Sequence, residues 1–251
     1  MQRYFVSLNQ IDKKNNKAVI TGQDHHHIKN VMKMHNNEKV IVCDGLGNDY
    51  YCHILNIDSQ TTLSIDEIKV NNNELDCYVS IAQGLVKKTK CDEVLRRLVE
   101  LGASEYFNVS MDFSVVKDKS EFGNNNSYLE RRKLIVKEAS EQSERGKLLE
   151  VIQTKSFNEF LKYSKEFDIK ICCYEESGRS GDTSLNNLRN KLGGKKVIAI
   201  VGPEGGFSKK EINLLDEAGF SFYGLGKRIL RTETAPLYLM SVLGFLTDSK
   251  E

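Results

Sequence analysis

The chain of 251 residues has only two prolines and no excess of either charge. Lysine and arginine number 36 against 35 aspartates and glutamates, which gives a formal net charge of +1. This balance excludes a globally basic nucleic-acid binder but permits a local basic patch. With 39% apolar and 28% charged residues, the composition is that of one large or two smaller folded domains with a sizeable core.

Long apolar runs and paired cysteine motifs are also missing. No run approaches the roughly 18 apolar residues of a membrane span. The first residues lack the apolar core of a signal peptide, so we expect a cytoplasmic protein whose six cysteines are thiols. No two cysteines have C-x-x-C spacing, which gives no support for a zinc knuckle or a redox pair. Cys172 and Cys173 lie in an apolar run and are expected to be small core residues.

An asparagine triplet at residues 71–73 separates two regions whose patterns of apolar residues and turns differ. Before it, short β-branched or apolar segments are broken by turns, which predicts a small β-rich domain with one helix near residues 27–34. The predicted strands are residues 17–21, 38–43, 50–57 and 61–68.

After the triplet the pattern alternates between strand and helix. Strands are predicted at residues 77–85, 106–111, 169–174, 197–201 and 221–225, and helices at residues 92–101, 126–145, 209–218 and 236–247. This alternation favours an α/β domain with a mostly parallel sheet covered on both faces. Such sheets bind ligands where strand C-termini meet helix N-termini.

A glycine loop, Gly202-Pro-Glu-Gly-Gly-Phe-Ser208, directly follows the apolar strand 197–201. Its glycines permit close approach by a ligand, and Ser208 with Glu211 forms a capping box for the next helix. The loop matches neither phosphate-binding glycine pattern, and Glu204 suits a neutral or cationic ligand. A plain tight turn before a capped helix explains the loop equally well.

A second loop begins at Gly224-Leu-Gly226 and leads into the last helix through residues 227–235. Helix capping explains Thr232, Glu233 and Thr234 in this segment. It does not explain Arg228 and Arg231, since the helix dipole disfavours cations near a helix N-terminus. An anionic partner for one of these arginines would resolve the conflict.

Together these loops resemble the paired C-terminal signature of the RsmE family, the bacterial 16S ribosomal RNA (uracil-N3) methyltransferases of the SPOUT superfamily. The signature residues are 202–208, Leu225-Gly226 and Arg228-Ile-Leu-Arg-Thr-Glu-Thr-Ala235. Further marks of the family lie along the whole chain. They are Arg3-Tyr-Phe5, His26-His27-Ile, Val31-Met-Lys33, Asp44-Gly45, residues 87–90, Glu100-Leu-Gly102 and residues 138–143 with Arg145.

The resemblance implies a PUA-like, RNA-binding β-barrel over residues 1–71 and a SPOUT methyltransferase domain over residues 72–251. The second domain would be a parallel sheet with a trefoil knot, a feature that connection rules alone disfavour. The resemblance also implies a homodimer and S-adenosylmethionine as methyl donor. The implied acceptor is N3 of the uridine at position 1498 of 16S rRNA, presented in the small ribosomal subunit.

Site residues follow from the family motifs by position. The implied donor pocket comprises Val201, Gly202, Pro203, Glu204, Gly205, Gly206, Leu225, Gly226, Ile229, Leu230 and Arg231. Methylation requires N3 to lose a weakly acidic proton, for which Glu233 and Glu204 are the candidate bases. Arg231 is the candidate stabiliser of negative charge on the uracil.

RNA contacts are implied for Arg3, His26, His27, Lys33, Lys87, Lys90 and Arg145. A solvated lysine turn is an equal alternative for Lys87 and Lys90, and a structural role is favoured for the two histidines. The run of three histidines that begins at His25 diverges too much to share one ion, so no metal site is expected. Phe113 departs from the family, since an arginine usually precedes Ser114-Val-Val116.

Three other functions remain open. A non-catalytic RNA-binding or ribosome-assembly factor with this fold would not bind the donor. A related enzyme acting on another RNA or another atom would bind it, and only product mapping would distinguish that case. A nucleotide-dependent enzyme is a weak third alternative because the phosphate motifs are missing.

Overall fold

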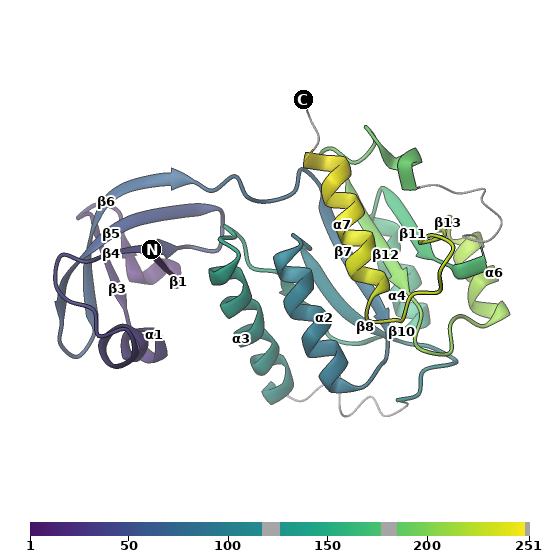
Figure 1. The fold of residues 1–251 in the computed structure, drawn as a ribbon, viewed down its shortest axis with the longest axis horizontal. Helices are drawn as coiled ribbons and strands as arrows, with labels where there is room; N and C mark the ends of the chain where they lie inside the picture. Colours follow the sequence, from purple (N-terminus) through teal and green to yellow (C-terminus); the bar gives the residue numbers. More distant parts are fainter. Residues whose placement is uncertain (117–125, 177–184, 249–251) are drawn as a thin grey trace. The chain divides into compact units, whose positions relative to one another are not determined.

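The computed structural model describes residues 1–116, 126–176 and 185–248, which divide into two compact units (Figure 1). Unit 1 comprises Met1–Glu74 and Ser140–Leu148, and unit 2 comprises Leu75–Ala139 and Leu149–Glu251. The chain therefore leaves unit 1, returns to it once and leaves it again. The contiguous division proposed from the sequence does not include this return.

Unit 1 is built on a six-stranded sheet in the order β1-β4-β5-β6-β3-β2. β1 is parallel to β4, and the other neighbours are antiparallel. The strands are β1 (Gln2–Phe5), β2 (Ile11–Asp12), β3 (Lys17–Ile20), β4 (Lys39–Cys43), β5 (Asn48–Ile57) and β6 (Thr61–Val70). The four predicted strands are confirmed, while β1 and β2 are additional.

The helix predicted near residues 27–34 is wrong at both ends. A short helix α1 (Gly22–His26) comes first and continues as a π-helical turn η2 (His27–Val31). Its first turn is polar, with Gln23 and Asp24, so no apolar periodicity indicates it. Lys33, at φ 50°, already lies in the left-handed region beyond the helix.

Unit 2 contains a sheet in the order β10-β8-β7-β12-β11-β13, with β9 also paired to β8. Every one of these pairings is parallel, as predicted. The strands are β7 (Tyr78–Gly84), β8 (Glu105–Ser110), β9 (Glu150–Val151), β10 (Lys155–Ser156), β11 (Ile169–Cys173), β12 (Lys196–Val201) and β13 (Ser221–Tyr223).

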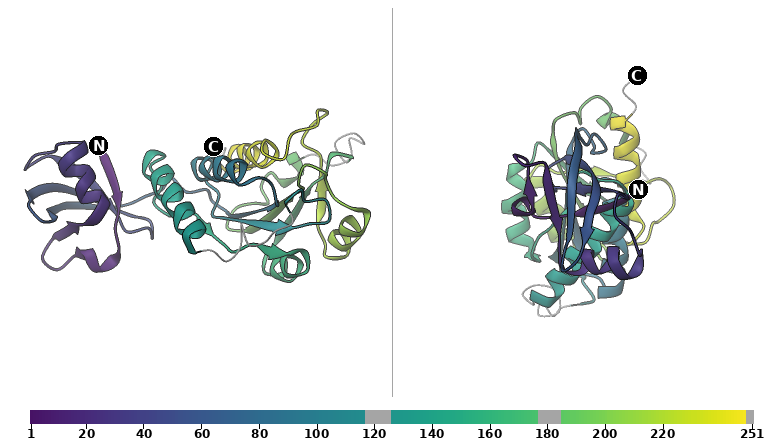
Figure 2. Two further views of the ribbon diagram at one scale, coloured as in Figure 1. Left: turned by 90° about the horizontal axis from the view of Figure 1, so that it is seen from below. Right: turned by 90° about the vertical axis from the view of Figure 1, so that its left-hand side faces the viewer.

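Helices cover both faces of this sheet (Figures 1 and 2). Successive side chains of β12 point to opposite faces of the sheet and enter two separate apolar cores. Val197 and Ala199 belong to one core, and Ile198 and Ile200 belong to the other. The first face is covered by α2 (Lys88–Glu100), α3 (Asn126–Gln142) and α7 (Ala235–Asp248), and the second by α4 (Phe157–Tyr163) and α6 (Lys209–Glu217).

The last helix, α7, has one buried and one exposed apolar side. Leu239, Met240 and Leu243 are fully buried, whereas Tyr238 and Phe245 are 40% and 63% exposed. Part of this nearly continuous apolar sequence therefore lies outside the core of the described chain. Within the described residues, no helix combines the length and the apolar character that crossing a bilayer requires.

Candidate functional site

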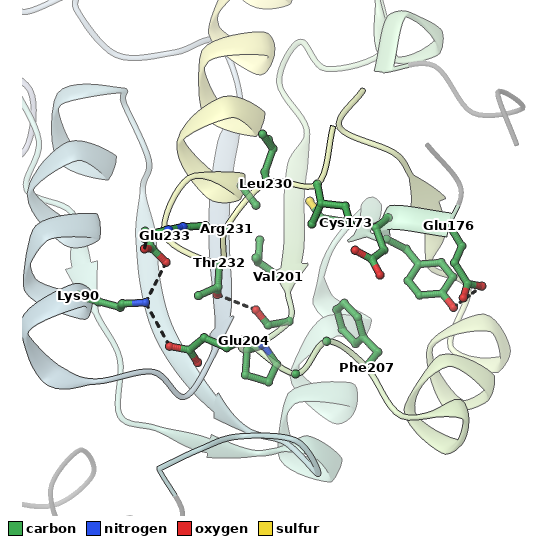
Figure 3. Close-up of a pocket in the computed structure, with 18 residues that line it drawn as sticks. Lys90, Cys173, Glu176, Val201, Glu204, Phe207, Leu230, Arg231, Thr232 and Glu233 are labelled. Carbon is green, nitrogen blue, oxygen red and sulfur yellow. Dashed lines mark hydrogen bonds and ion pairs between the residues drawn. The ribbon is translucent and has the colours of Figure 1, made fainter. Parts of the chain in front are cut away.

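A cavity of about 500 Å³ opens where β11 and β12 end, at the edge predicted to bind a ligand (Figure 3). This volume is in the range of small-molecule sites. Three segments and one helix line the cavity. The lining residues are Lys90, Cys173, Tyr174, Glu175, Glu176, Val201, Gly202, Pro203, Glu204, Gly205, Gly206, Phe207, Ile229, Leu230, Arg231, Thr232, Glu233 and Ala235.

Most of the implied donor-pocket residues lie together in this cavity. Residues 201–206 and 229–231 line it, whereas Leu225 and Gly226 do not. Leu225 instead packs against the core cluster of the first sheet face. The segment from Cys173 to Glu176 was missed by the sequence analysis. Its signal was available, since the parallel neighbour β11 must end at the same edge as β12.

The glycine loop is confined by close neighbours. A Cβ on Gly205 would lie 2.8 Å from Cβ of Phe113, and Gly206 adopts φ 72°. The predicted capping box of α6 is confirmed, because Ser208 Oγ accepts from Glu211 N at 3.2 Å and Ser208 N donates to Glu211 at 2.9 Å. Backbone groups of the loop are therefore held in place beside the cavity.

Thr232 connects the second loop to the first. Its hydroxyl donates to the carbonyl oxygen of Gly202 at 2.7 Å, and its own carbonyl accepts from Gln83 at 2.8 Å. Helix capping alone would predict that the Thr232 hydroxyl caps α7. The hydroxyl instead bonds the glycine loop. The two motifs that resembled a signature in sequence are joined directly in space.

Lys90 links the acidic residues of both loops. Its ammonium lies 3.3 Å from Glu204 and 3.2 Å from Glu233, and Glu233 is also 4.0 Å from Arg231 Nη1 (Figure 3). Burial alone would raise the pKa of Glu233. Hydrogen bonding to its own backbone amide and to Lys90, with the charges of Lys90 and Arg231, outweighs burial and lowers that pKa. Glu233 therefore stays ionised at neutral pH.

The cavity wall from β11 is acidic and contains a neutral thiol. Burial raises the pKa of Cys173 to about 12, so this side chain is no thiolate nucleophile at neutral pH. Tyr174 donates to Glu176 at 2.7 Å. With Glu175, Glu204 and Glu233, the lining has four carboxylates against the cations of Lys90 and Arg231. This excess suits a cationic ligand.

Two of the implied RNA contacts are buried inside unit 1. Arg3 is 2.7 Å from Asp49, and Arg145 is 2.6 Å from Glu74, with only 4% of either arginine side chain exposed. Arg3 also donates to the carbonyl oxygen of Arg145 at 3.3 Å. Both arginines therefore hold unit 1 together, and we correct their assignment as RNA contacts to a structural role.

The remaining implied RNA contacts are accessible to different degrees. His26, Lys33 and Lys87 are exposed, and Lys90 lies at the cavity instead. His27 is half-buried, and its Nδ1 is 3.0 Å from the hydroxyl of Tyr4. Because His27 also stacks edge-on against Tyr4, its contacts fit the structural role favoured for it.

Known proteins share both the sequence and the fold. Residues 73–244 match the family model of an RNA methyltransferase domain and residues 20–63 that of an RNA methyltransferase PUA domain. The chain is 35% identical to ribosomal RNA small subunit methyltransferase E of Bacillus subtilis, covering 99% of this chain and 98% of that protein. The Mesomycoplasma hyopneumoniae enzyme of the same name is 29% identical, with 96% and 98% covered.

A solved structure matches over nearly the whole length. It is the ribosomal RNA small subunit methyltransferase E of Neisseria gonorrhoeae bound to S-adenosyl methionine. The TM-score is 0.82 at 26% identity, and 98% of each chain is covered.

Proposed function

This chain belongs to the RsmE family, and we propose that it transfers a methyl group from S-adenosylmethionine to N3 of the uridine at position 1498 of 16S rRNA in the small ribosomal subunit. The observation that carries the proposal is the joining of the two family loops around one acid-rich cavity through Thr232 and Lys90.

The cavity fits the donor in size, polarity and charge. Gly202, Gly205 and Gly206 leave backbone groups open to an adenosine, and Val201, Ile229 and Leu230 supply an apolar wall. The surplus of carboxylates suits a cationic sulfonium and an ammonium group. When bound, S-adenosylmethionine supplies a methyl group that its sulfonium already activates for transfer.

The protein residues then have to manage the proton and the charge of the uracil. N3 must lose its proton as the new N–C bond forms, and a carboxylate within reach can accept it. We assign to Arg231, whose side chain is 85% exposed at the cavity, the stabilisation of negative charge that develops on the uracil.

Glu204 and Glu233 are the two candidate bases. The lowered pKa of Glu233 makes it a weaker base than an ordinary glutamate and supports a different role, in which it holds Lys90 and Arg231 in place. Glu204 contacts Lys90 and, with 34% of its side chain exposed against 24% for Glu233, is the more exposed of the two carboxylates, so it is the preferred proton acceptor.

RNA binding is assigned to unit 1 and to the start of α2. Lys87 lies exposed immediately before that helix, close in sequence to the cavity residue Lys90. His26, His27 and Lys33 lie together at and after α1 in unit 1, part of which matches the PUA domain family. The proposal therefore gives phosphate contacts to Lys87 and Lys33 and a supporting role to the histidines.

Three further features belong to the proposal. The C-terminal segments of the SPOUT domain thread into a trefoil knot, and two chains form a homodimer that completes the active site. The enzyme acts in the cytoplasm, where small subunits are assembled.

The decisive experiment is methyl transfer from labelled S-adenosylmethionine to small subunits that lack the modification, followed by primer extension. An N3-methyl blocks base pairing, so reverse transcription is expected to stop at one uridine. A stop elsewhere would change the substrate and keep the donor. No incorporation together with no donor binding would favour the assembly-factor alternative.

Two substitutions test the residue roles within that assay. Arg231→Ala and Glu233→Ala should each lower turnover by about 100-fold, the cost of removing one stabilising group in a transition state. Lys227→Ala, an exposed cation of the same loop outside the cavity, is the matched control. Wild-type turnover in both test variants would refute these roles.

A further inference from the structure

A chain of buried polar side chains runs behind the cavity without lining it. Gln83, Tyr106 and Asn108 have no exposed surface, and Arg132 is 1% exposed. In the parallel sheet, Gln83 is in register with Val201 on one side and with Asn108 on the other. The sheet thus places these groups in a row that ends at the glycine loop.

The hydrogen bonds in this row are continuous. Arg132 Nη2 donates to Asn108 Oδ1 at 3.0 Å, and Asn108 Nδ2 donates to the hydroxyl of Tyr106 at 3.3 Å. That hydroxyl donates to Gln83 Oε1 at 2.6 Å. Gln83 Nε2 donates to the carbonyl oxygen of Thr232 at 2.8 Å, and Thr232 donates to Gly202.

Arg132 determines the direction of every hydrogen bond in this row. A guanidinium can only donate, so Asn108 must present its oxygen to Arg132 and its amino group to Tyr106. Burial raises the pKa of Tyr106 well above its usual value, so the phenol keeps the proton that it donates. Gln83 is left with its amino group facing Thr232.

We propose that Arg132, Asn108, Tyr106 and Gln83 are positioning residues that orient Thr232 and Gly202 and thereby set the shape of the methyl-donor cavity. This inference rests on the proposed function for the identity of the ligand. The direction of the chain matters because a reversed Gln83 would turn its own oxygen toward the carbonyl of Thr232, and two acceptors repel.

Asn108→Asp tests the direction with almost no change in volume. The new carboxylate still accepts from Arg132, but its second oxygen draws the Tyr106 proton away from Gln83. We expect about tenfold weaker binding of S-adenosylmethionine by calorimetry, the loss of about one hydrogen bond. The melting temperature should be unchanged or higher, because Arg132, whose Nε is 3.9 Å from Asp92, gains a second charged partner.

Tyr106→Phe is the second variant and interrupts the row of hydrogen bonds by removing one hydroxyl. It should weaken donor binding to a similar extent. Tyr78→Phe is the matched control, since Tyr78 donates to Glu105 at 2.8 Å on the same sheet and takes no part in this row of hydrogen bonds. This control should lose stability comparably and keep wild-type donor affinity.

Two substitutions of Thr232, where the row of hydrogen bonds ends, complete the test. Thr232→Ser keeps the hydroxyl and should bind the donor nearly as the wild type does, whereas the isosteric Thr232→Val should not. Donor affinity that follows melting temperature across all variants, the control included, would overturn the inference. Absence of donor binding by the wild type would instead refute the proposed function.

Discussion

Gly84, the last residue of β7, lies directly under the glycine loop. A Cβ at this position would be 2.5 Å from both N and Cδ of Pro203 and 3.1 Å from the carbonyl carbon of Gly202. These are backbone and ring atoms that cannot swing aside, so Gly84→Ala should displace the loop. We expect a loss of about 1–3 kcal/mol in the free energy of unfolding from overpacking, together with weaker binding of S-adenosylmethionine by calorimetry.

The control for Gly84 is Gly194, where an alanine would strain the backbone but would not clash with any neighbouring atom. Gly194 adopts φ 67°, and a Cβ at this position would have no neighbouring atom within 4 Å. It precedes the end of β12 that is far from the cavity. Gly194→Ala should cost about 1 kcal/mol of stability by strain and leave donor affinity unchanged. Equal donor affinities in the two variants would contradict the role given to Gly84.

At the residue scale, prediction from sequence succeeded where neighbours along the chain carry the signal. Gly202 to Gly206 follow an apolar strand, at the edge where open parallel sheets bind ligands, and the family resemblance favoured a ligand loop over a plain tight turn. Arg3 and Arg145 were misassigned because their partners, Asp49 and Glu74, are distant in sequence. No local pattern distinguishes an arginine that will be buried in an ion pair from one that will meet RNA.

Two helices of unit 2 begin with the same capping box in different surroundings. Ser208 caps α6 by accepting a hydrogen bond from the Glu211 amide, and its hydroxyl also donates to Asp112 Oδ2 at 2.7 Å. The buried Glu211 carboxylate in turn accepts from the Asp112 amide. Ser156 of α4 bonds only its own Glu159 among the described contacts. Ser156→Ala should therefore cost about 1 kcal/mol of unfolding free energy, and Ser208→Ala about 2 kcal/mol.

Denaturant unfolding of both variants measures this difference. The extra cost at Ser208 arises because the Asp112 carboxylate loses the hydrogen bond that the Ser208 hydroxyl donates. Equal losses of unfolding free energy would mean that the contact with Asp112 adds nothing to the cap.

At the element scale, periodicity located the apolar strands and the long helices to within a few residues. It failed for α1, whose first turn is polar, and for β2, β9 and β10, which have two residues each. Such elements owe their conformation to tertiary contacts, and a window of sequence cannot contain those.

The path of the chain between the two units is the least predictable feature of the whole molecule. Residues 126–145 were predicted as one helix, yet Ser140–Leu148 belongs with unit 1. Glu74 accepts from the side chain of Arg145 and from the amides of Gly146 and Lys147, which anchors this segment. These contacts join residues about seventy positions apart, and only the folded structure brings them together.

The exposed side of α7 makes a prediction about the proposed homodimer. Tyr238 and Phe245 remain exposed although their helix neighbours are buried, and exposed aromatic side chains are typical of interfaces between subunits. In a dilution series followed by sedimentation, methyl-transfer activity should fall in parallel with the fraction of dimer. Phe245→Asp should shift the equilibrium to monomer at a fixed concentration, since the charge would be buried unpaired in an interface.

Leu134→Asp provides the comparison, because Leu134 is an apolar residue 49% exposed on α3 and outside the proposed interface. It should stay dimeric and active, which would separate a general effect of a surface charge from loss of the interface. Thermal unfolding of Leu134→Asp should resemble that of the wild type at the same protein concentration, as expected for a surface substitution. Phe245→Asp should melt at a lower temperature, because it loses the stabilisation that dimerisation adds. A Phe245→Asp monomer with full activity would show that one chain suffices for catalysis, and the active site would then need no partner.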